Sequence, residues 1–496
     1  MQGRDAQVID HGLHHGKEIS QSGGVAATQE ESYLARVALS FTDWAEKWFP
    51  DAYIFAAIAA IIVGCAAVVN GASPAAVAKS FGDGFWSLIP FTMQMAFIVI
   101  GGYVVATSPP AIRLIDRLAS VPKTGKGAIV FTAFVSLATS LISWGFCAIF
   151  SGLVVRSLAK RRDIRMDYRA AGAAAYVGLG ATWALGMSSS AALLQANPGS
   201  LPPALLKITG VIPITDTIFL WQSGVVIAAL VGVTLVVALL SAPSDSRAMT
   251  AEDMAIEFVS RIEPSVARRP GEWFEHSPLI AILIGGAGLG WLAQEFARQS
   301  PITAIANLNT YNFMFLTVGL LLHWRPRKFL AAVADSVPAT TGILIQFPLY
   351  GATAAILTSA VGYSGQAVST RIAQFFVDIT TANSFPVVMG VYSAILGLFI
   401  PSGGGKWIIE APYVMEAANA LHIHLGWAVQ IYNAAEALPN LINPFWMLPI
   451  LGILGLKARD LVGFTFLQLL THFPVVLFLL WVLAGTLSYT PPVIPH

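Results

Sequence analysis

The amino-acid sequence predicts an all-α polytopic membrane protein: an inverted repeat with about nine spanning helices and two re-entrant helical hairpins. Three observations support this prediction. Hydrophobic residues make up 56% of the 496 residues and charged residues only 11%, against about 25% charged in a soluble domain. Several apolar runs exceed about 18 residues, which is long enough for a helix to cross a bilayer. Two further apolar segments have lengths that fit neither one crossing nor two.

Residues 1–40 are predicted to form a disordered cytoplasmic tail. They are polar and lack the positive and then apolar pattern of a signal peptide. The histidines His11, His14 and His15 are too sparse to indicate a metal site, and we predict no metal and no other cofactor. A net charge of +1 gives no indication of a nucleic-acid partner, whereas the apolar runs predict a protein surrounded by the lipid bilayer.

The first unusual segment runs from Ala128 to Val155 and has positive loops at both ends. Lysine and arginine mark cytoplasmic loops, so a single crossing would place one of these loops on the wrong side. Two crossings would need about 40 residues, and roughly 28 are present. A re-entrant hairpin that enters and leaves on the cytoplasmic side satisfies both constraints. Its tip is predicted at SWGF, residues Ser143 to Phe146.

The second unusual segment runs from Phe385 to Ala420 and is broken by PSGGG, residues Pro401 to Gly405. Proline removes a backbone donor and ends a helix, and glycine permits a tight reversal of the chain. We therefore predict a second hairpin with its tip at this break.

Similar signals recur in the same order in the two halves of the chain, about 250 residues apart. Gln94 and Gln346 each interrupt an apolar run, the two predicted tips follow, and an Asn-Pro pair comes after each tip, at Asn197–Pro198 and Asn443–Pro444. The positive loops place the two halves in opposite orientations. An inverted repeat with broken helices is an architecture of secondary transporters.

These signals predict the order of segments, with a cytoplasmic N-terminus. The tail is followed by a first repeat at 41–241 with hairpin one, a polar cytoplasmic linker at 242–277, a connecting span at 278–300, and a second repeat at 301–490 with hairpin two. The spans are expected near residues 53–72, 87–108, 171–195, 218–241, 278–296, 309–323, 338–360, 428–452 and 462–487.

Several motifs together resemble the short-chain fatty acid transporter family, of the acetoacetate/butyrate permease type, in the ion-transporter superfamily. They are FGDGFWSLIPFTMQMAF (81–97), SWGF (143–146), QANPGS (195–200), GILIQFPLYG (342–351), PSGGGKWIIEAPYV (401–414) and NPFWMLP (443–449). The likeness covers the chain from about Phe41 to the last apolar run. The resemblance implies a multi-pass permease of the cytoplasmic (inner) membrane for small monocarboxylates. Membership of the superfamily implies a homodimer and elevator-type movement.

The sequence departs from the family pattern at polar positions near the expected site. Lys406 stands where Gln or His is usual, and Glu410 stands where Gln is usual. Ser143 replaces an Asn at the first tip, and Asn443 replaces a Gln before PFW. The resemblance therefore supports the predicted architecture more strongly than it supports the predicted substrate.

The substrate site is predicted at the two hairpin tips. Glycines let a ligand approach the backbone, and the start of a helix offers N–H groups to an anion. Lys406 and Glu410 share a helix face: either Lys406 attracts the substrate carboxylate, or the two form only a mutual ion pair. Trp407 and the hydroxyl of Thr182 are further candidates. The predicted substrate-binding residues are Ser143, Trp144, Gly145, Ser402, Gly403, Gly404, Gly405, Lys406 and Asn443.

Glu436 is the candidate for coupling transport to an ion, with Asn440 beside it. The resemblance contributes to this assignment, because Glu436 and Asn440 keep the acid and the Asn of a Gly-Asp/Glu-x-Trp-x-Asn pattern of the family, although Ala435 and Leu438 replace its Gly and Trp. A carboxylate within an apolar helix can take up a proton or hold a sodium ion. The sequence leaves three alternatives open for Glu436: proton uptake, sodium binding and a purely structural role.

The predicted function is secondary active transport of short-chain fatty acids or related small monocarboxylates by cation symport. The alternative is symport of a different small organic anion, such as a dicarboxylate or an amino-acid derivative. We predict that the protein is not an enzyme, because the sequence has no HExxH or GxSxG motif and no paired aspartates at membrane depth. A passive channel would differ by showing flux that does not saturate.

Overall fold

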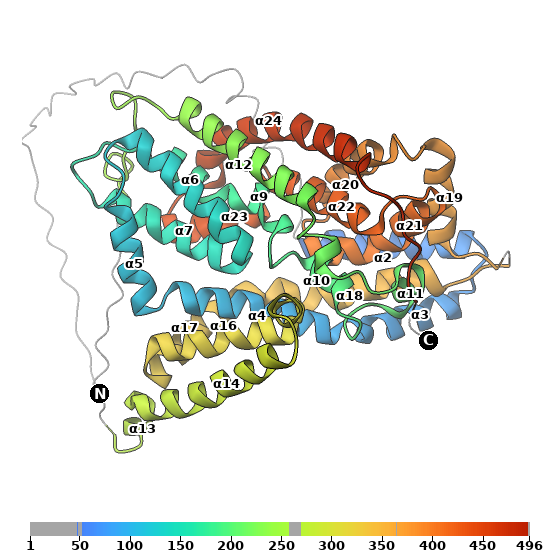
Figure 1. The fold of residues 1–496 in the computed structure, drawn as a ribbon, viewed down its shortest axis with the longest axis horizontal. Helices are drawn as coiled ribbons and strands as arrows, with labels where there is room; N and C mark the ends of the chain where they lie inside the picture. Colours follow the sequence, from blue (N-terminus) through green and yellow to red (C-terminus); the bar gives the residue numbers. More distant parts are fainter. Residues whose placement is uncertain (1–46, 48–51, 257–268, 364, 495–496) are drawn as a thin grey trace, which may run out of the picture.

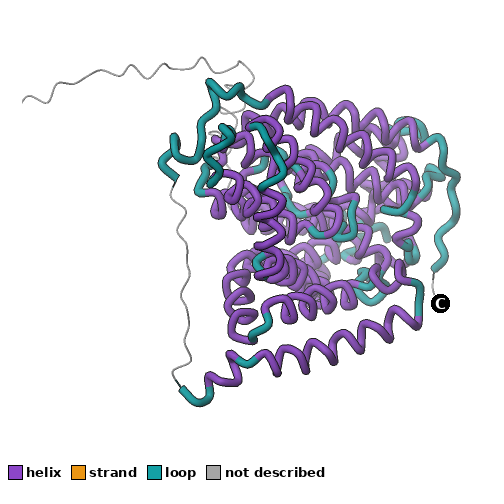
Figure 2. Tube along the Cα trace, turned by 60° about the vertical axis from the view of Figure 1, so that its left-hand side comes forward, coloured by secondary structure: helices purple, strands orange, loops and turns teal. Residues whose placement is uncertain are grey.

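The computed structural model describes residues 47, 52–256, 269–363 and 365–494, so the predicted tail at 1–40 lies outside the described residues. Within these ranges the chain forms helices and no strands (Figure 2), which confirms the all-α prediction. In the described part of the chain, seven helical segments are long and apolar enough to cross a membrane: 89–106, 125–142, 168–196, 221–241, 278–298, 326–359 and 458–484. The total of about nine spans stays a prediction.

The first half of the chain begins with a long helix, a helix pair and a short amphipathic helix, and continues with a hairpin, a broken helix and a second long helix. Its helices are α2 (Ala52–Val69), α3 (Pro74–Ser87), α4 (Ile89–Ala106), α5 (Pro109–Ala119), α6 (Gly125–Ile142), α7 (Trp144–Ala159), α8 (Tyr168–Tyr176), α9 (Gly178–Ala181), η1 (Trp183–Leu185), α10 (Ser190–Ala196), α11 (Pro203–Thr209), η2 (Ile214–Asp216) and α12 (Trp221–Ser241).

The second half repeats this order after a connecting segment. The segment and the second half consist of α13 (Glu272–His276), α14 (Pro278–Arg298), α15 (Pro301–Ala306), α16 (Leu308–His323), α17 (Pro326–Ser336), η3 (Val337–Thr340), α18 (Thr341–Ser359), α19 (Val368–Ile379), α20 (Phe385–Phe399), α21 (Gly403–Ala420), α22 (Leu425–Asn440), α23 (Pro444–Leu454) and α24 (Ala458–Ala484).

The helices form two layers that run along the long axis of the molecule (Figure 1). In the layer that we call the scaffold layer, α18 packs against α2 and α3, and α16 packs against α4 and α14. In the layer that we call the hairpin layer, α6 packs against α7 and α8, α12 packs against α24, and α20 packs against α22. Across the layers, α7 contacts α4 and α21 contacts α18. Each layer contains helices from both halves, so the two predicted repeats interleave.

Hairpin one consists of α6 and α7, which pack against each other. Ser143 joins them with an extended backbone, and its hydroxyl accepts a hydrogen bond from the Phe146 N–H at 3.4 Å, which caps α7. The turn falls within the residues predicted for the first tip. The hydroxyl of Tyr311 on α16 donates to the carbonyl of Ile142 at 2.5 Å, so the scaffold layer contacts this tip directly.

Hairpin two consists of α20 and α21, which meet at Pro401 and Ser402. The hydroxyl of Ser402 accepts a hydrogen bond from the Gly405 N–H at 3.1 Å and caps α21. Its two arms have different neighbours: α20 packs against α22 and α24, and α21 packs against α18 and α19. In Figure 1 the two hairpins lie toward opposite ends of the long axis, which is the arrangement that an inverted repeat requires.

Each hairpin is followed by a helix that is interrupted near its middle. In the second half the interruption is at 441–443, between α22 and α23. In the first half it is at 186–189, between η1 and α10, inside a span that the sequence predicts as continuous. The pairing of Asn197–Pro198 with Asn443–Pro444 is therefore wrong. Asn197 ends α10 and donates to the carbonyl of Ala306 at 2.9 Å.

Candidate functional site

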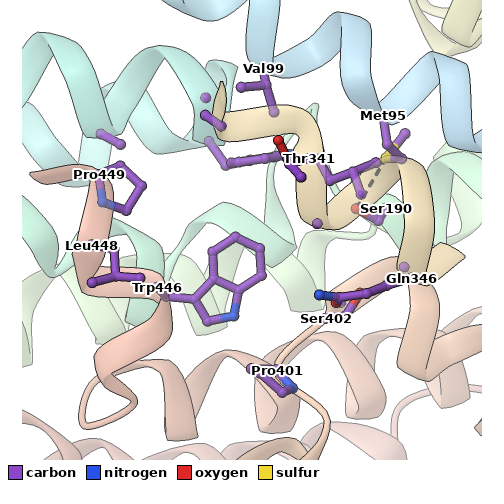
Figure 3. A pocket seen from close by; sticks show the side chains of 18 of the residues that line it. Met95, Val99, Ser190, Thr341, Gln346, Pro401, Ser402, Trp446, Leu448 and Pro449 are labelled. Carbon is purple, nitrogen blue, oxygen red and sulfur yellow. Dashed lines mark hydrogen bonds between the residues drawn. The ribbon is translucent and has the colours of Figure 1, made fainter. Parts of the chain in front are cut away.

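A cavity of about 610 Å³ lies between the two hairpin tips and the scaffold layer (Figure 3). Its walls come from α4, α7, α18, the start of α21 and α23. Typical lining residues are Met95, Val99, Trp144, Gln346, Ser402 and Trp446. Mostly apolar walls with a few polar groups are usual for a site that binds a small molecule.

None of the described residues that line this cavity is a lysine, arginine, histidine, aspartate or glutamate. The polar side chains in the lining are neutral, and they include Ser190, Thr341, Gln346 and Ser402. An anion in this cavity would therefore be held by hydroxyl, amide and backbone N–H groups. Neutral donors suit a single carboxylate better than a ligand with two negative charges, because the second charge would be desolvated without a partner.

The residues predicted at the first tip divide into two groups. Trp144 and Gly145 line the cavity. Ser143 is buried and serves as the helix cap, and it is absent from the described lining. Thr182 is also buried away from the cavity, where its hydroxyl lies 2.7 Å from that of Ser140.

At the second tip, Ser402, Gly403 and Gly404 line the cavity. A Cβ atom at Gly403 would lie 2.3 Å from the Trp183 ring, so only glycine fits this close approach. Gly405 is predicted as a ligand contact, but it faces Tyr350, whose ring carbon would lie 2.0 Å from an added Cβ. Gly405 therefore serves helix packing.

Lys406 and Glu410 are both fully buried on α21 and form a mutual ion pair. The Lys406 ammonium donates to a Glu410 carboxylate oxygen at 2.9 Å, to the Ser393 hydroxyl at 2.7 Å and to the Ser393 carbonyl at 2.9 Å. These contacts use all three of its protons. Neither charged side chain lines the cavity. A direct contact between Lys406 and the substrate does not fit this conformation, and the ion-pair alternative describes what the structure shows.

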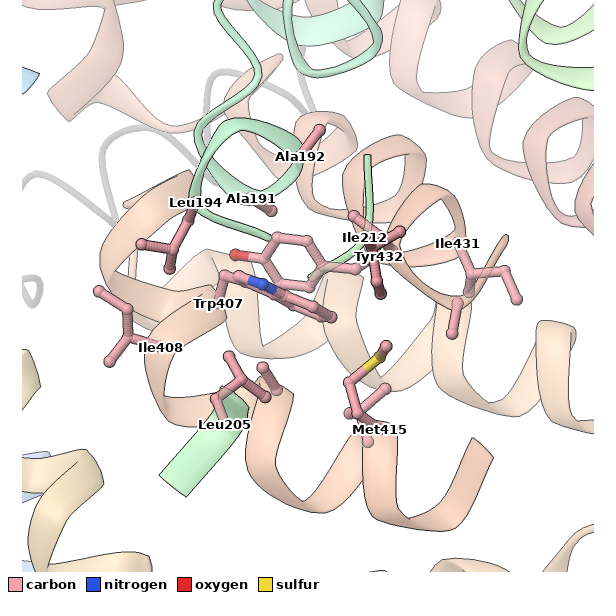
Figure 4. Packing of buried hydrophobic residues seen from close by; sticks show 14 of the residues in the cluster. Ala191, Ala192, Leu194, Leu205, Ile212, Trp407, Ile408, Met415, Ile431 and Tyr432 are labelled. Carbon is pink, nitrogen blue, oxygen red and sulfur yellow. The ribbon is translucent and has the colours of Figure 1, made fainter. Parts of the chain in front are cut away.

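The remaining predicted residues lie around the interrupted helix of the second half. Asn443 is buried in the interruption, and its amide lies 3.5 Å from the carbonyl of Leu398. Trp407 is fully buried among α10, α21 and α22, with its ring centroid 4.6 Å from that of Tyr432 (Figure 4). It therefore belongs to the hydrophobic core and does not form a wall of the cavity.

Glu436 is fully buried on α22, beside the start of α21. Among the described residues, neither of its carboxylate oxygens has a hydrogen-bond partner, and the same holds for the side-chain oxygen of Asn440 one turn later. A Cβ atom at Gly403 would lie 3.3 Å from a Glu436 oxygen, which places the carboxylate next to the second tip. An ionised carboxylate without partners is costly to bury, so this environment favours a neutral Glu436 or one that is paired with a cation.

Most of the residues that line the cavity have no site role in the sequence-based prediction, and Trp183 and Gln346 are two of them. Trp183 follows no recognisable motif and reaches the cavity through the interrupted helix of the first half. Gln346 enters the sequence-based prediction only as a repeat signal, together with Gln94. Its location in GILIQFPLYG, one of the motifs of the resemblance, was the available signal for a functional role.

Comparison with known proteins identifies the family. The family model described as "Short chain fatty acid transporter" matches residues 33–483. The chain belongs to the short-chain fatty acid transporter family. Two relatives carry this transporter description in their names. The one from Escherichia coli (strain K12) is 32% identical over 440 residues, 88% of this chain and 97% of the relative. The one from Haemophilus influenzae is 31% identical over 452 residues, which are 89% of this chain and 98% of the relative.

Solved structures with a similar fold are also transporters. The YdaH transporter of Alcanivorax borkumensis, described as having an unusual topology, has a TM-score of 0.53 at 14% identity over 88% of this chain and 98% of that one. MtrF of Neisseria gonorrhoeae, described with a class of antimetabolite efflux pumps, has a TM-score of 0.53 at 15% identity. The match covers 92% of this chain and 98% of MtrF. At these identities the likeness concerns the fold. Family and fold together show that this member of the short-chain fatty acid transporter family is a multi-pass membrane transporter.

Proposed function

We propose that this protein is a secondary active transporter of short-chain fatty acids or related small monocarboxylates, and that the cavity between the hairpin tips is its substrate site. One observation carries this proposal: the described lining of the cavity is largely apolar and without charged side chains, and it includes the start of α21. These properties match a ligand with one carboxylate and a short apolar tail. They favour it over the alternative of a dicarboxylate.

The carboxylate would be received by the second tip. The first N–H groups of a helix have no intrahelical acceptor, and the positive end of the helix dipole attracts an anion. On α21 these are the N–H groups of Gly403 and Gly404, next to the hydroxyl of Ser402. The acyl tail would pack against apolar side chains such as Met95 and Val99 on α4.

Accumulation of an anion requires a co-transported cation. Moving one negative charge into a cell that is negative inside opposes the membrane potential by about 2.3 kcal/mol per 100 mV. Glu436 supplies a position for that cation, because its carboxylate is buried beside Gly403 at the edge of the substrate site. The coupling ion in this proposal is a proton or a sodium ion.

The proposed movement is of the elevator type. Both hairpin tips belong to the hairpin layer, while α4 and α18 close the cavity from the scaffold layer. A displacement of the hairpin layer would carry the bound substrate past a fixed scaffold. From the family resemblance we further propose a homodimer in the cytoplasmic membrane, with the N-terminus in the cytoplasm.

Uptake into proteoliposomes tests this function. Purified protein would be reconstituted, and uptake of labelled butyrate and acetoacetate would be followed with an inward proton gradient, a sodium gradient or neither. We expect saturable uptake that one of the two gradients drives, and weak competition by succinate. Protein-free liposomes are the control. Non-saturable flux would indicate a channel, and stronger competition by succinate than by butyrate would favour the dicarboxylate alternative.

A further inference from the structure

Gln346 presents an amide donor to the cavity. The residue lies on α18, lines the cavity and is only 6% exposed. Its side-chain oxygen accepts a hydrogen bond from the Tyr350 hydroxyl, one turn later, at 3.3 Å. Because the oxygen is engaged by this donor, the NH₂ group is the end of the amide available to a ligand. Figure 3 shows the Gln346 nitrogen at the tip of the side chain, in the open part of the site.

The Gln346 NH₂ group has no acceptor among the residues that the structure describes. Gln94, its counterpart on α4, differs in this respect. The NH₂ group of Gln94 donates to the Asn309 side chain at 2.9 Å, and its oxygen accepts from the Ser200 hydroxyl at 2.9 Å. Gln94 therefore joins structural elements to each other, whereas the NH₂ group of Gln346 is open to the cavity and is not used in a structural contact of the described residues.

The orientation of Gln346 depends on the second hairpin. Tyr350 is fully buried and packs against Gly405 so closely that a Cβ atom there would lie 2.0 Å from its ring. The glycine thus creates the space in which the tyrosine ring sits. Through Tyr350, the start of α21 sets the direction of the Gln346 amide. Donors of the scaffold layer and of the hairpin layer consequently face the same cavity.

We propose that Gln346 is a substrate-orienting residue, whose NH₂ group donates a hydrogen bond to one carboxylate oxygen of a small monocarboxylate. The other oxygen meets the N–H groups of Gly403 and Gly404. This inference rests on the proposed function and adds a binding residue outside the hairpins. A carboxylate only accepts hydrogen bonds, so it matches a site built from donors. Because Gln346 belongs to the scaffold layer, this contact breaks when the hairpin layer moves.

The test is the KM of labelled butyrate in counterflow exchange, which needs no ion gradient and so does not depend on coupling. Gln346→Glu replaces the two donors by acceptors at nearly constant shape, and Gln346→Leu removes the polar group. We expect KM to rise about tenfold or more in both variants, since a hydrogen bond to a charged group is lost. The maximal exchange rate should change much less. Tyr350→Phe frees the amide to rotate and should raise KM by a few-fold.

The matched control is Gln294→Glu, the same substitution at an exposed position of α14, which should leave KM unchanged. Thermal unfolding of each purified variant shows whether it is folded. If Gln346→Leu does not fold, the KM values of Gln346→Glu and Tyr350→Phe test the inference. A wild-type KM in folded Gln346→Glu would overturn the inference. If the wild-type protein exchanges no butyrate, the proposed function itself fails, and that result is distinguishable from the first.

Discussion

The charged residues of the second hairpin show how burial changes the meaning of a sequence signal. Lys406 and Glu410 stand four residues apart, and this spacing predicts that they share a helix face. The spacing does not reveal that this face points into the protein, because both faces of α21 are buried. The pair is completed by Ser393 on the preceding helix. The network therefore joins the two arms of hairpin two behind the cavity.

Removal of one partner should destabilise the protein. Lys406→Gln leaves Glu410 buried without its cation, and breaking a buried pair in this way costs about 3–5 kcal/mol. The double variant Lys406→Gln with Glu410→Gln removes both charges and should recover most of the loss. Thermal unfolding in detergent measures both effects. The double variant should still exchange butyrate, because neither side chain lines the cavity. A single variant as stable as the wild type would contradict this account.

The sequence predicts the backbone of the site better than its side chains. Ser402, Gly403 and Gly404 are predicted as substrate contacts because a Pro-Ser-Gly break lets a ligand approach the backbone, and in the structure they line the cavity. Gln346 does not emerge as a site residue, since one glutamine in an apolar helix equally fits an interhelical hydrogen bond. Only the three-dimensional positions of Tyr350 and Gly405 separate the two interpretations.

At the scale of helices, charge and length locate both hairpin turns, but not the interruption at 186–189. The turns at Ser143 and Ser402 fall where loop charge, proline and glycine predict them. The segment Gly186 to Ser189 contains no proline and therefore reads as continuous helix. The Asn443–Pro444 pair does mark the interruption between α22 and α23. The Asn197–Pro198 pair does not mark the interruption of the first half, because Asn197 lies at the end of α10.

The re-entrant topology of hairpin one predicts the same side of the membrane for both loops that flank it. Reporters fused after Arg113, on the short helix α5, and after Arg162, in the loop after α7, should both be cytoplasmic, because both connecting segments are rich in lysine and arginine. Paired alkaline phosphatase and fluorescent-protein fusions measure this. A periplasmic reporter after Arg162, with a cytoplasmic one after Arg113, would make the segment an ordinary single crossing.

At the scale of the whole molecule, the two hairpin tips and the candidate coupling residue belong to the hairpin layer, and the scaffold layer closes the cavity from the other side. Glu436 stands on α22 beside the start of α21, so a cation bound there and an anion at the hairpin tip would move together. Their joint movement would neutralise the charge of the substrate during crossing. This arrangement supports the proposed symport.

Replacement of Glu436 should separate exchange from accumulation. Glu436→Gln keeps the shape of the side chain but takes up no proton and holds a cation poorly. We expect this variant to retain counterflow exchange of butyrate and to lose accumulation driven by a gradient. Both activities are measured in proteoliposomes next to the wild type. Accumulation at the wild-type level would exclude Glu436 as the coupling residue.

The central claim is that the substrate binds between the hairpin tips, and protection of a cysteine from labelling tests it most directly. Ser402→Cys places a thiol in the lining of the cavity, and Ser246→Cys, at an exposed position of the polar segment after α12, serves as an internal control in the same protein. The rate of reaction with a small maleimide is followed by mass spectrometry at each site. We predict that saturating butyrate slows labelling at position 402 and leaves labelling at position 246 unchanged. Equal labelling rates at position 402 with and without butyrate, in protein that transports butyrate, would contradict the claim.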